Sequence, residues 1–118
     1  MAETYKRLGQ GQVALAVDAS NGILYACPAD TTAIIRQMIF SNVDASAIHA
    51  LTLYHIDNGG SANDTKVILK AANIESGGWA DFTGTIILEA QDELRGLCTL
   101  NDAEATDITY VLYGLELS

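Results

Sequence analysis

The chain has 118 residues, of which 49% are hydrophobic, and its 15 acidic and six basic side chains give a formal net charge of −9. This length predicts one domain whose core is large enough to fold without a disulfide or a metal. The charge argues against nucleic-acid binding, which needs clustered Lys and Arg. No apolar run is long enough for a signal peptide or a membrane span. We therefore expect a protein made in the cytoplasm that binds neither nucleic acid nor membrane.

Short β-branched runs recur at nearly even spacing, separated by acidic or Gly- and Asn-rich turns. The runs are Gln12–Val17, Ile23–Ala26, Ala33–Ser41, Ala47–His55, Thr65–Lys70, Thr85–Glu89, Leu94–Leu100 and Ile108–Leu117. This spacing, without a long segment of helical period, is typical of an all-β sandwich or barrel. We predict one antiparallel, jelly-roll-like β-sandwich of about eight strands over residues 1–118. Residues 1–11 form either its first strand or an N-terminal arm.

The first two runs flank Asn21-Gly22, a pair that favours tight turns, so the sequence predicts a hairpin there. In the third run, strict alternation places Ile35 and Ile39 on one face and Met38 and Phe40 on the other, so both faces are apolar. Such a strand is expected at the centre of a sheet or at a subunit contact. These four residues are candidate interface residues.

The run Ala47–His55 places His49 and His55 on one strand face. Six residues of extended chain separate them by about 20 Å, too far to share one metal ion. We expect two surface or interface histidines and no metal site. The polar segment Ile56–Asp64 has many side-chain oxygens but not the spacing of an EF-hand, so a surface loop is favoured over a calcium site.

The segment Glu75–Phe82 holds the only tryptophan. In the preferred interpretation, Trp79 and Phe82 cap the core or contact a neighbouring subunit, and both join the candidate interface residues. In the alternative, Trp79 stacks on a sugar ring while Asp81 and the loop Asp57–Asp64 accept hydroxyl hydrogen bonds.

Catalytic signatures are missing from the sequence. It has no nucleophile elbow and no Gly-rich phosphate loop, and the adjacent acids Asp92 and Glu93 point in opposite directions on an extended chain. Cys27 and Cys98 match no zinc spacing and are expected to be buried free thiols, with a disulfide as the alternative if their strands are neighbours. We predict no enzyme, no cofactor and no metal ligand.

The charge is unevenly divided along the chain. Residues through Lys70 have a net charge of −1, whereas the segment from Ala71 onward has nine acids against Arg95 alone. This division predicts one strongly acidic region of the sandwich and one nearly neutral, more apolar region that serves as the contact surface.

Several segments share a pattern of strand ends and turns. They are Ile39–Val43, Leu51–Tyr54, Ala71–Gly78, Phe82–Arg95 and Asp107–Leu117. The pattern is a strand ending in Leu, an acidic tight turn, a strand with Leu and Arg, and a closing strand that ends Tyr-Gly-x-Glu. Over about Leu24–Leu117 the chain resembles small all-β virion proteins of tailed bacteriophages. It departs from them at Gln91, where such proteins usually have glycine.

The resemblance implies a structural role in the virion. The expected protein is a head decoration or cement protein, a homotrimer that binds the major capsid protein shell after assembly in the host cytoplasm. A phage tail or fibre component is an alternative within this class. A carbohydrate-binding β-sandwich module is the alternative from a different class.

Overall fold

The computed structural model describes residues 3–13, 22–44, 48–60, 64–99 and 108–117. These residues form eight strands and one short 3-10 helix. In chain order the elements are β1 (Glu3–Gln12), β2 (Ile23–Ala26), β3 (Thr32–Asn42), β4 (His49–Ile56), η1 (Asp64–Lys66), β5 (Val67–Ile74), β6 (Trp79–Leu88), β7 (Glu93–Thr99) and β8 (Ile108–Leu117). None of the described segments is a helix of the length and apolar character needed to cross a bilayer.

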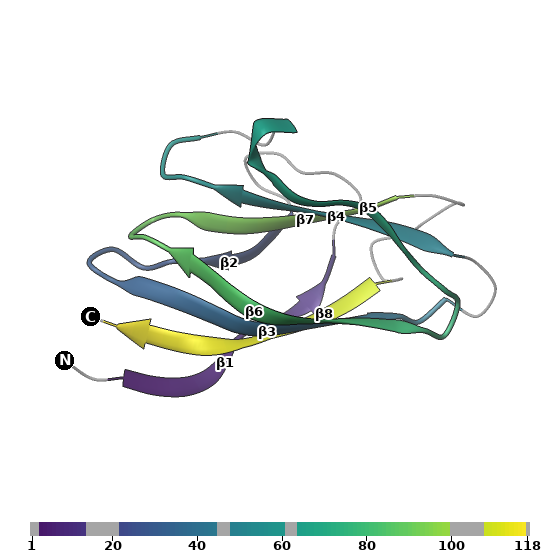
Figure 1. Cartoon of the computed structure of the whole chain (residues 1–118), viewed down its shortest axis with the longest axis horizontal. Helices are drawn as coiled ribbons and strands as arrows, with labels where there is room; N and C mark the ends of the chain where they lie inside the picture. The colour runs from purple at the N-terminus through teal and green to yellow at the C-terminus, as the bar shows by residue number, and fades with distance from the viewer. Residues whose placement is uncertain (1–2, 14–21, 45–47, 61–63, 100–107, 118) are drawn as a thin grey trace.

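The strands form two four-stranded sheets packed face to face (Figure 1). Sheet A has the order β1-β8-β3-β6, sheet B has the order β2-β7-β4-β5, and all pairs are antiparallel. Two sheets with this interlocked order make an eight-stranded jelly roll. The predicted all-β, jelly-roll-like sandwich is therefore confirmed. Residues 1–11 were expected to form either the first strand or an N-terminal arm. Residues 3–11 belong to β1, which pairs with β8.

The described residues of the first two runs do not form the predicted hairpin. β1 pairs with β8 and β2 pairs with β7, so the chain passes from sheet A to sheet B between them. The Asn-Gly pair favours a local turn, but each strand pairs where its apolar face reaches the core shared by the two sheets. Residues 14–21, which include part of the first predicted run, lie outside the described residues.

A β-bulge in β3 changes which of its residues face the core. The register with β8 shifts between Ile35 and Gln37, so Arg36 is an extra residue of β3 relative to β8. Ile35, Met38 and Phe40 consequently face inward and are fully buried, while Ile39 faces outward. Strict alternation would have placed Ile35 and Ile39 on one face, so the bulge corrects the predicted grouping, while both faces of β3 are apolar as predicted.

The sandwich is closed along one side, where β1 meets β2. A side chain at Gly9 would place its Cβ 2.8 Å from the Leu24 carbonyl oxygen, so only glycine allows this approach. The Tyr110 hydroxyl donates a 3.0 Å hydrogen bond to the same oxygen. Tyr25 of β2 also donates to Glu116 of β8. We call β1 and β2 the closed side, and β5 and β6, at the other edges of the two sheets, the open side.

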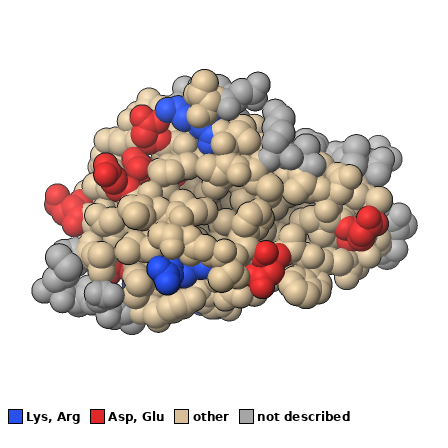
Figure 2. All heavy atoms as spheres, viewed as in Figure 1, with Lys and Arg blue, Asp and Glu red and all other residues tan. Residues whose placement is uncertain are grey.

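Among the described residues, the acidic side chains do not divide between the two halves of the chain as the sequence predicted. Each sheet combines strands from the first and the second half of the chain, so acids from both halves lie together. Asp30, Asp57 and Glu89 lie in or beside the turns at one end of the sandwich. Figure 2 shows acidic side chains toward the left end of the molecule, with others at the lower middle and near the right end.

Candidate functional site

The outer face of sheet A, which points away from sheet B, has two rows with apolar side chains, separated by the mixed row Arg7, Tyr113, Gln37 and Thr83. In one cross-strand row, Tyr5 lies beside Leu115, Leu115 beside Ile34, and Ile34 beside Ile87. A second row places Val111 next to Ile39. We define this outer face by the residues Tyr5, Ile34, Ile39, Trp79, Ile87, Val111, Tyr113 and Leu115, all of which are exposed or partly exposed.

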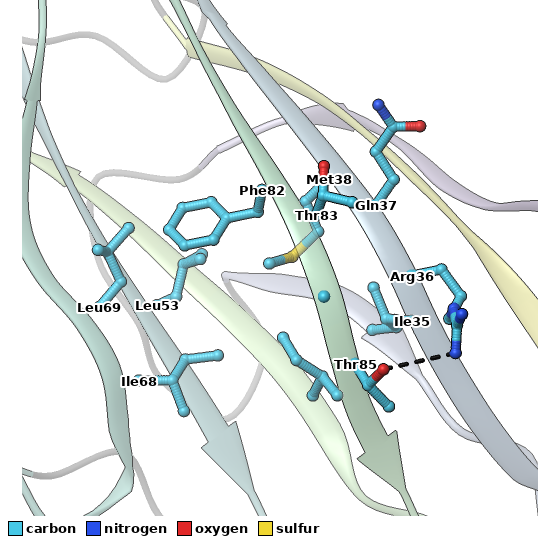
Figure 3. Close-up of a pocket in the computed structure, with 12 residues that line it drawn as sticks. Ile35, Arg36, Gln37, Met38, Leu53, Ile68, Leu69, Phe82, Thr83 and Thr85 are labelled. Carbon is cyan, nitrogen blue, oxygen red and sulfur yellow. Dashed lines mark hydrogen bonds between the residues drawn. The ribbon is translucent and has the colours of Figure 1, made fainter.

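A groove opens between β5 and β6 on the open side. It has a volume of about 250 Å³, and Ile68 and Leu69 line it from sheet B. Phe82 and Ile86 line it from the edge strand of sheet A, with Met38 at its floor. In Figure 3 the labelled side chains of Met38, Ile68, Leu69 and Phe82 converge on the space between the sheets, while Arg36 and Gln37 point to the other side of β6. The groove is thus an uncovered part of the hydrophobic core.

The predicted interface residues fall into three environments. Ile35, Met38 and Phe40 are buried between the sheets, and the first two also border the groove. Phe82 is partly exposed inside the groove. Ile39 and Trp79 lie on the outer face of sheet A, where Trp79 is 69% exposed. The six predicted residues therefore lie in the core, in the groove and on the outer face of sheet A.

The proposed sugar site is only partly assembled. Trp79 and Asp81 alternate onto the same face of β6, and Asp81 accepts a 3.3 Å hydrogen bond from Gln37. The turn containing Asp57 precedes β5, whereas Trp79 follows it, so the two lie at opposite ends of an eight-residue strand. That strand spans about 26 Å. A composite of Trp79, Asp81 and the 57–64 loop is therefore wrong, because its parts are too far apart.

His49 is not a surface histidine as predicted. Its side chain is completely buried, and its Nε2 lies 2.9 Å from Asp44 Oδ2. His49 occupies the same strand face as Leu51 and Leu53, which fill the core, so the sheet carries it inward. His55 is partly exposed, and its Nε2 lies 3.2 Å from Asp92 Oδ2.

The acidic pair Asp92 and Glu93 makes separate structural contacts. Asp92 accepts 3.1 Å hydrogen bonds from the backbone N–H groups of Asn58 and Glu89, which joins two turns at one end of the sandwich. Glu93 instead forms an ion pair with Arg95. The two carboxylates therefore serve different parts of the structure and do not form one acid–base site.

The remaining candidate chemistry is structural. Cys27 and Cys98 are buried free thiols, as predicted, and burial raises the pKa of Cys27. Asp57 of the polar loop pairs with Lys66, which holds the pKa of that carboxyl below its usual range. Within the described residues, no three His, Cys, Asp or Glu side chains are grouped so that they hold a metal ion.

Comparison with known proteins adds one structural likeness. No protein-family model and no curated protein matches the chain. A chain in the structure of infectious bursal disease virus, Gx strain, aligns with a TM-score of 0.46 and 16% sequence identity. The alignment covers 98% of this chain and 31% of the viral chain, so the chain spans about a third of that protein's length. At this similarity the likeness carries no information on function.

Proposed function

We propose that this chain is a structural protein of a virus particle, a decoration or cement protein that binds the shell of major capsid protein as a homotrimer. The single observation that supports this proposal most is the pair of apolar rows on the outer face of sheet A. Ile34, Ile39, Val111 and Leu115 lie at its centre, on the two inner strands of the sheet. Exposed apolar side chains grouped on one face of a sheet are typical of a surface that binds another protein.

The location of this face favours a rigid, pre-formed contact. It lies on β3 and β8, which are hydrogen-bonded on both sides, so binding orders no new backbone. A partner that binds only the folded chain stabilises the assembled state by linkage, which is the physical basis of cementing a shell. The jelly roll itself is found in capsid proteins, lectins and cupins, so the fold permits this role without selecting it.

Co-sedimentation with heads of the virus that encodes the chain tests the proposal. We expect saturable binding of the wild-type chain, with a fixed number of copies per head. The substitution Ile39→Asp, at the centre of the outer face, should abolish binding. Val43→Asp is the matched control, because Val43 is 59% exposed but lies beyond the end of β3. Absence of saturable binding, or equal loss in both variants, would overturn the proposal.

The tail or fibre alternative is tested in the same way with isolated tails. The carbohydrate alternative rests on a reduced site, exposed Trp79 beside Asp81, that does not include the 57–64 loop. It predicts glycan-array binding that Trp79→Ala abolishes. We expect no glycan binding, because a single aromatic side chain offers a small platform on an otherwise open strand.

A further inference from the structure

The exposed large apolar side chains of the described residues are concentrated on the edges of the two sheets. On the closed side, Tyr5 of β1 is 54% exposed and Ile23 of β2 is 38% exposed. On the open side, Ile68 of β5 is 44% exposed, and Trp79 and Ile87 of β6 are 69% and 53% exposed. Both sides of the sandwich are therefore apolar at their rims, and the open side also has the groove.

The two sides carry opposite charges on the same face of sheet A. Arg7 on β1 and Asp81 on β6 are both exposed, and neither forms an ion pair within the described part of the chain. β8 and β3 lie between them, which separates the two strands by three strand spacings, about 14 Å. Arg7 and Asp81 of one molecule therefore cannot meet, whereas those of neighbouring molecules can.

The strand directions allow sheet A to continue from one molecule to the next. β1 runs antiparallel to β8, β8 to β3, and β3 to β6, so β6 is antiparallel to β1. A second molecule in the same orientation would thus place its β1 antiparallel to the free edge of β6. The edge is accessible, because the residues around Gly84 are exposed and nothing lies within 4 Å of a Cβ placed there.

We propose that the closed side of one copy of this chain packs against the open side of the next. β1 of one copy extends sheet A beyond β6 of its neighbour, Arg7 faces Asp81 across the joint, and the closed side covers the groove. The contact is head-to-tail, so it generates a ring when the rotation between copies closes. The number of copies, three, rests on the proposed function. The contact surfaces are inferred from the edge strands alone.

Charge reversal combined with sedimentation equilibrium tests the proposed contact. The wild-type chain should have a solution mass of three 12.5 kDa chains. Arg7→Glu and Asp81→Arg should each raise the dissociation constant by at least about tenfold, because each places like charges across the joint. The double variant Arg7→Glu/Asp81→Arg should restore association. Arg36→Glu is the matched control, since it makes the same charge change on an inner strand of sheet A and should leave the mass unchanged.

Each result decides the proposal. All substitutions are at exposed positions, so far-UV circular dichroism should be unchanged in every variant, and Ile87→Lys provides a second test of the same joint. A wild-type chain that stays monomeric at about 0.1 mM would overturn the contact. So would an oligomer that tolerates both single reversals, or one that the double variant fails to restore. An oligomer that ignores virus heads would refute the proposed function alone, and a monomer that binds heads would refute only this contact.

Discussion

Glu116, near the end of β8, accepts a hydrogen bond from the Tyr25 hydroxyl on β2, and its other carboxylate oxygen lies 2.8 Å from Lys6 Nζ on β1. One carboxylate therefore joins both strands of the closed side to the last strand of the chain. Lys6, and after it Tyr25, lowers the pKa of Glu116 below its usual value. The contact links the two sheets where the sandwich is held shut.

Replacing Glu116 by Gln should destabilise the fold in a pH-dependent way. Because the pKa of Glu116 is lowered in the folded state, its stabilisation is present above the unfolded pKa and is lost as pH falls through the folded pKa. We expect a loss of about 1 kcal/mol at pH 7, since the carboxylate is partly exposed. Urea unfolding at pH 7 and pH 2.5 measures it, and an equal difference at both pH values would contradict the ionic contribution.

The two buried tyrosine hydroxyls should ionise only when the chain unfolds in alkali. Burial raises the pKa of Tyr110, and burial followed by the bond to Glu116 raises the pKa of Tyr25. A raised pKa stabilises the folded state below the unfolded value of 10.0 and the stabilisation is lost as pH rises further. Phenolate absorbance should therefore include a step that coincides with unfolding by circular dichroism. Tyr25→Phe should reduce that step, and titration of both tyrosines well before unfolding would refute the prediction.

Replacing Gln91 by Gly should stabilise the chain. Gln91 has φ of 67°, and the Asp92 N–H donates a 3.0 Å hydrogen bond to the Glu89 carbonyl oxygen, which closes a β-turn. Removing the side chain relieves about 1–2 kcal/mol of strain from the left-handed backbone conformation. Glycine also raises the entropy of the unfolded chain, which opposes this gain by about 0.5–1 kcal/mol. We expect a net gain of about 0.5–1 kcal/mol in thermal or urea unfolding. Gln91→Ala, which keeps a Cβ at the same φ, should show no gain.

Replacing Gly114 by Ala should strongly destabilise sheet A. A Cβ at Gly114 would lie 2.0 Å from the Ile34 carbonyl oxygen, a backbone atom held in the neighbouring strand beside the bulge. We expect a loss of about 3 kcal/mol in the free energy of unfolding. Gly84→Ala, in open space on β6, should change it by less than about 0.5 kcal/mol. Similar effects at the two glycines would show that β3 and β8 are not in this close contact.

The fold class follows from the spacing of β-branched runs, but the pairing of the strands does not. A tight-turn pair such as Asn21-Gly22 reports only local backbone preference, whereas the jelly-roll order depends on which apolar faces meet across two sheets. The N-terminal half of β6 also escaped prediction, because residues such as Trp79 and Asp81 on an exposed edge strand show no clean alternation of apolar and polar side chains.

The candidate site shows the same division. The sequence identified the apolar strand β3 as a contact or central strand, and β3 lies inside sheet A between β8 and β6. The bulge at Arg36 determines which residues of β3 reach the surface, and no residue in this part of the sequence indicates a bulge. Arg7 was not among the candidate interface residues, and Asp81 was considered only for sugar binding. The sequence does not show that β1 and β6, which carry these residues, are the two edge strands of one sheet.

The most direct test of the central claim is a cryo-EM reconstruction of virus heads incubated with the purified chain. We predict β-sandwich density at symmetric positions on the shell, with the outer face of sheet A, centred on Ile39 and Val111, against the capsid protein. Heads without added density, or density in which this outer face points to solvent, would contradict the account.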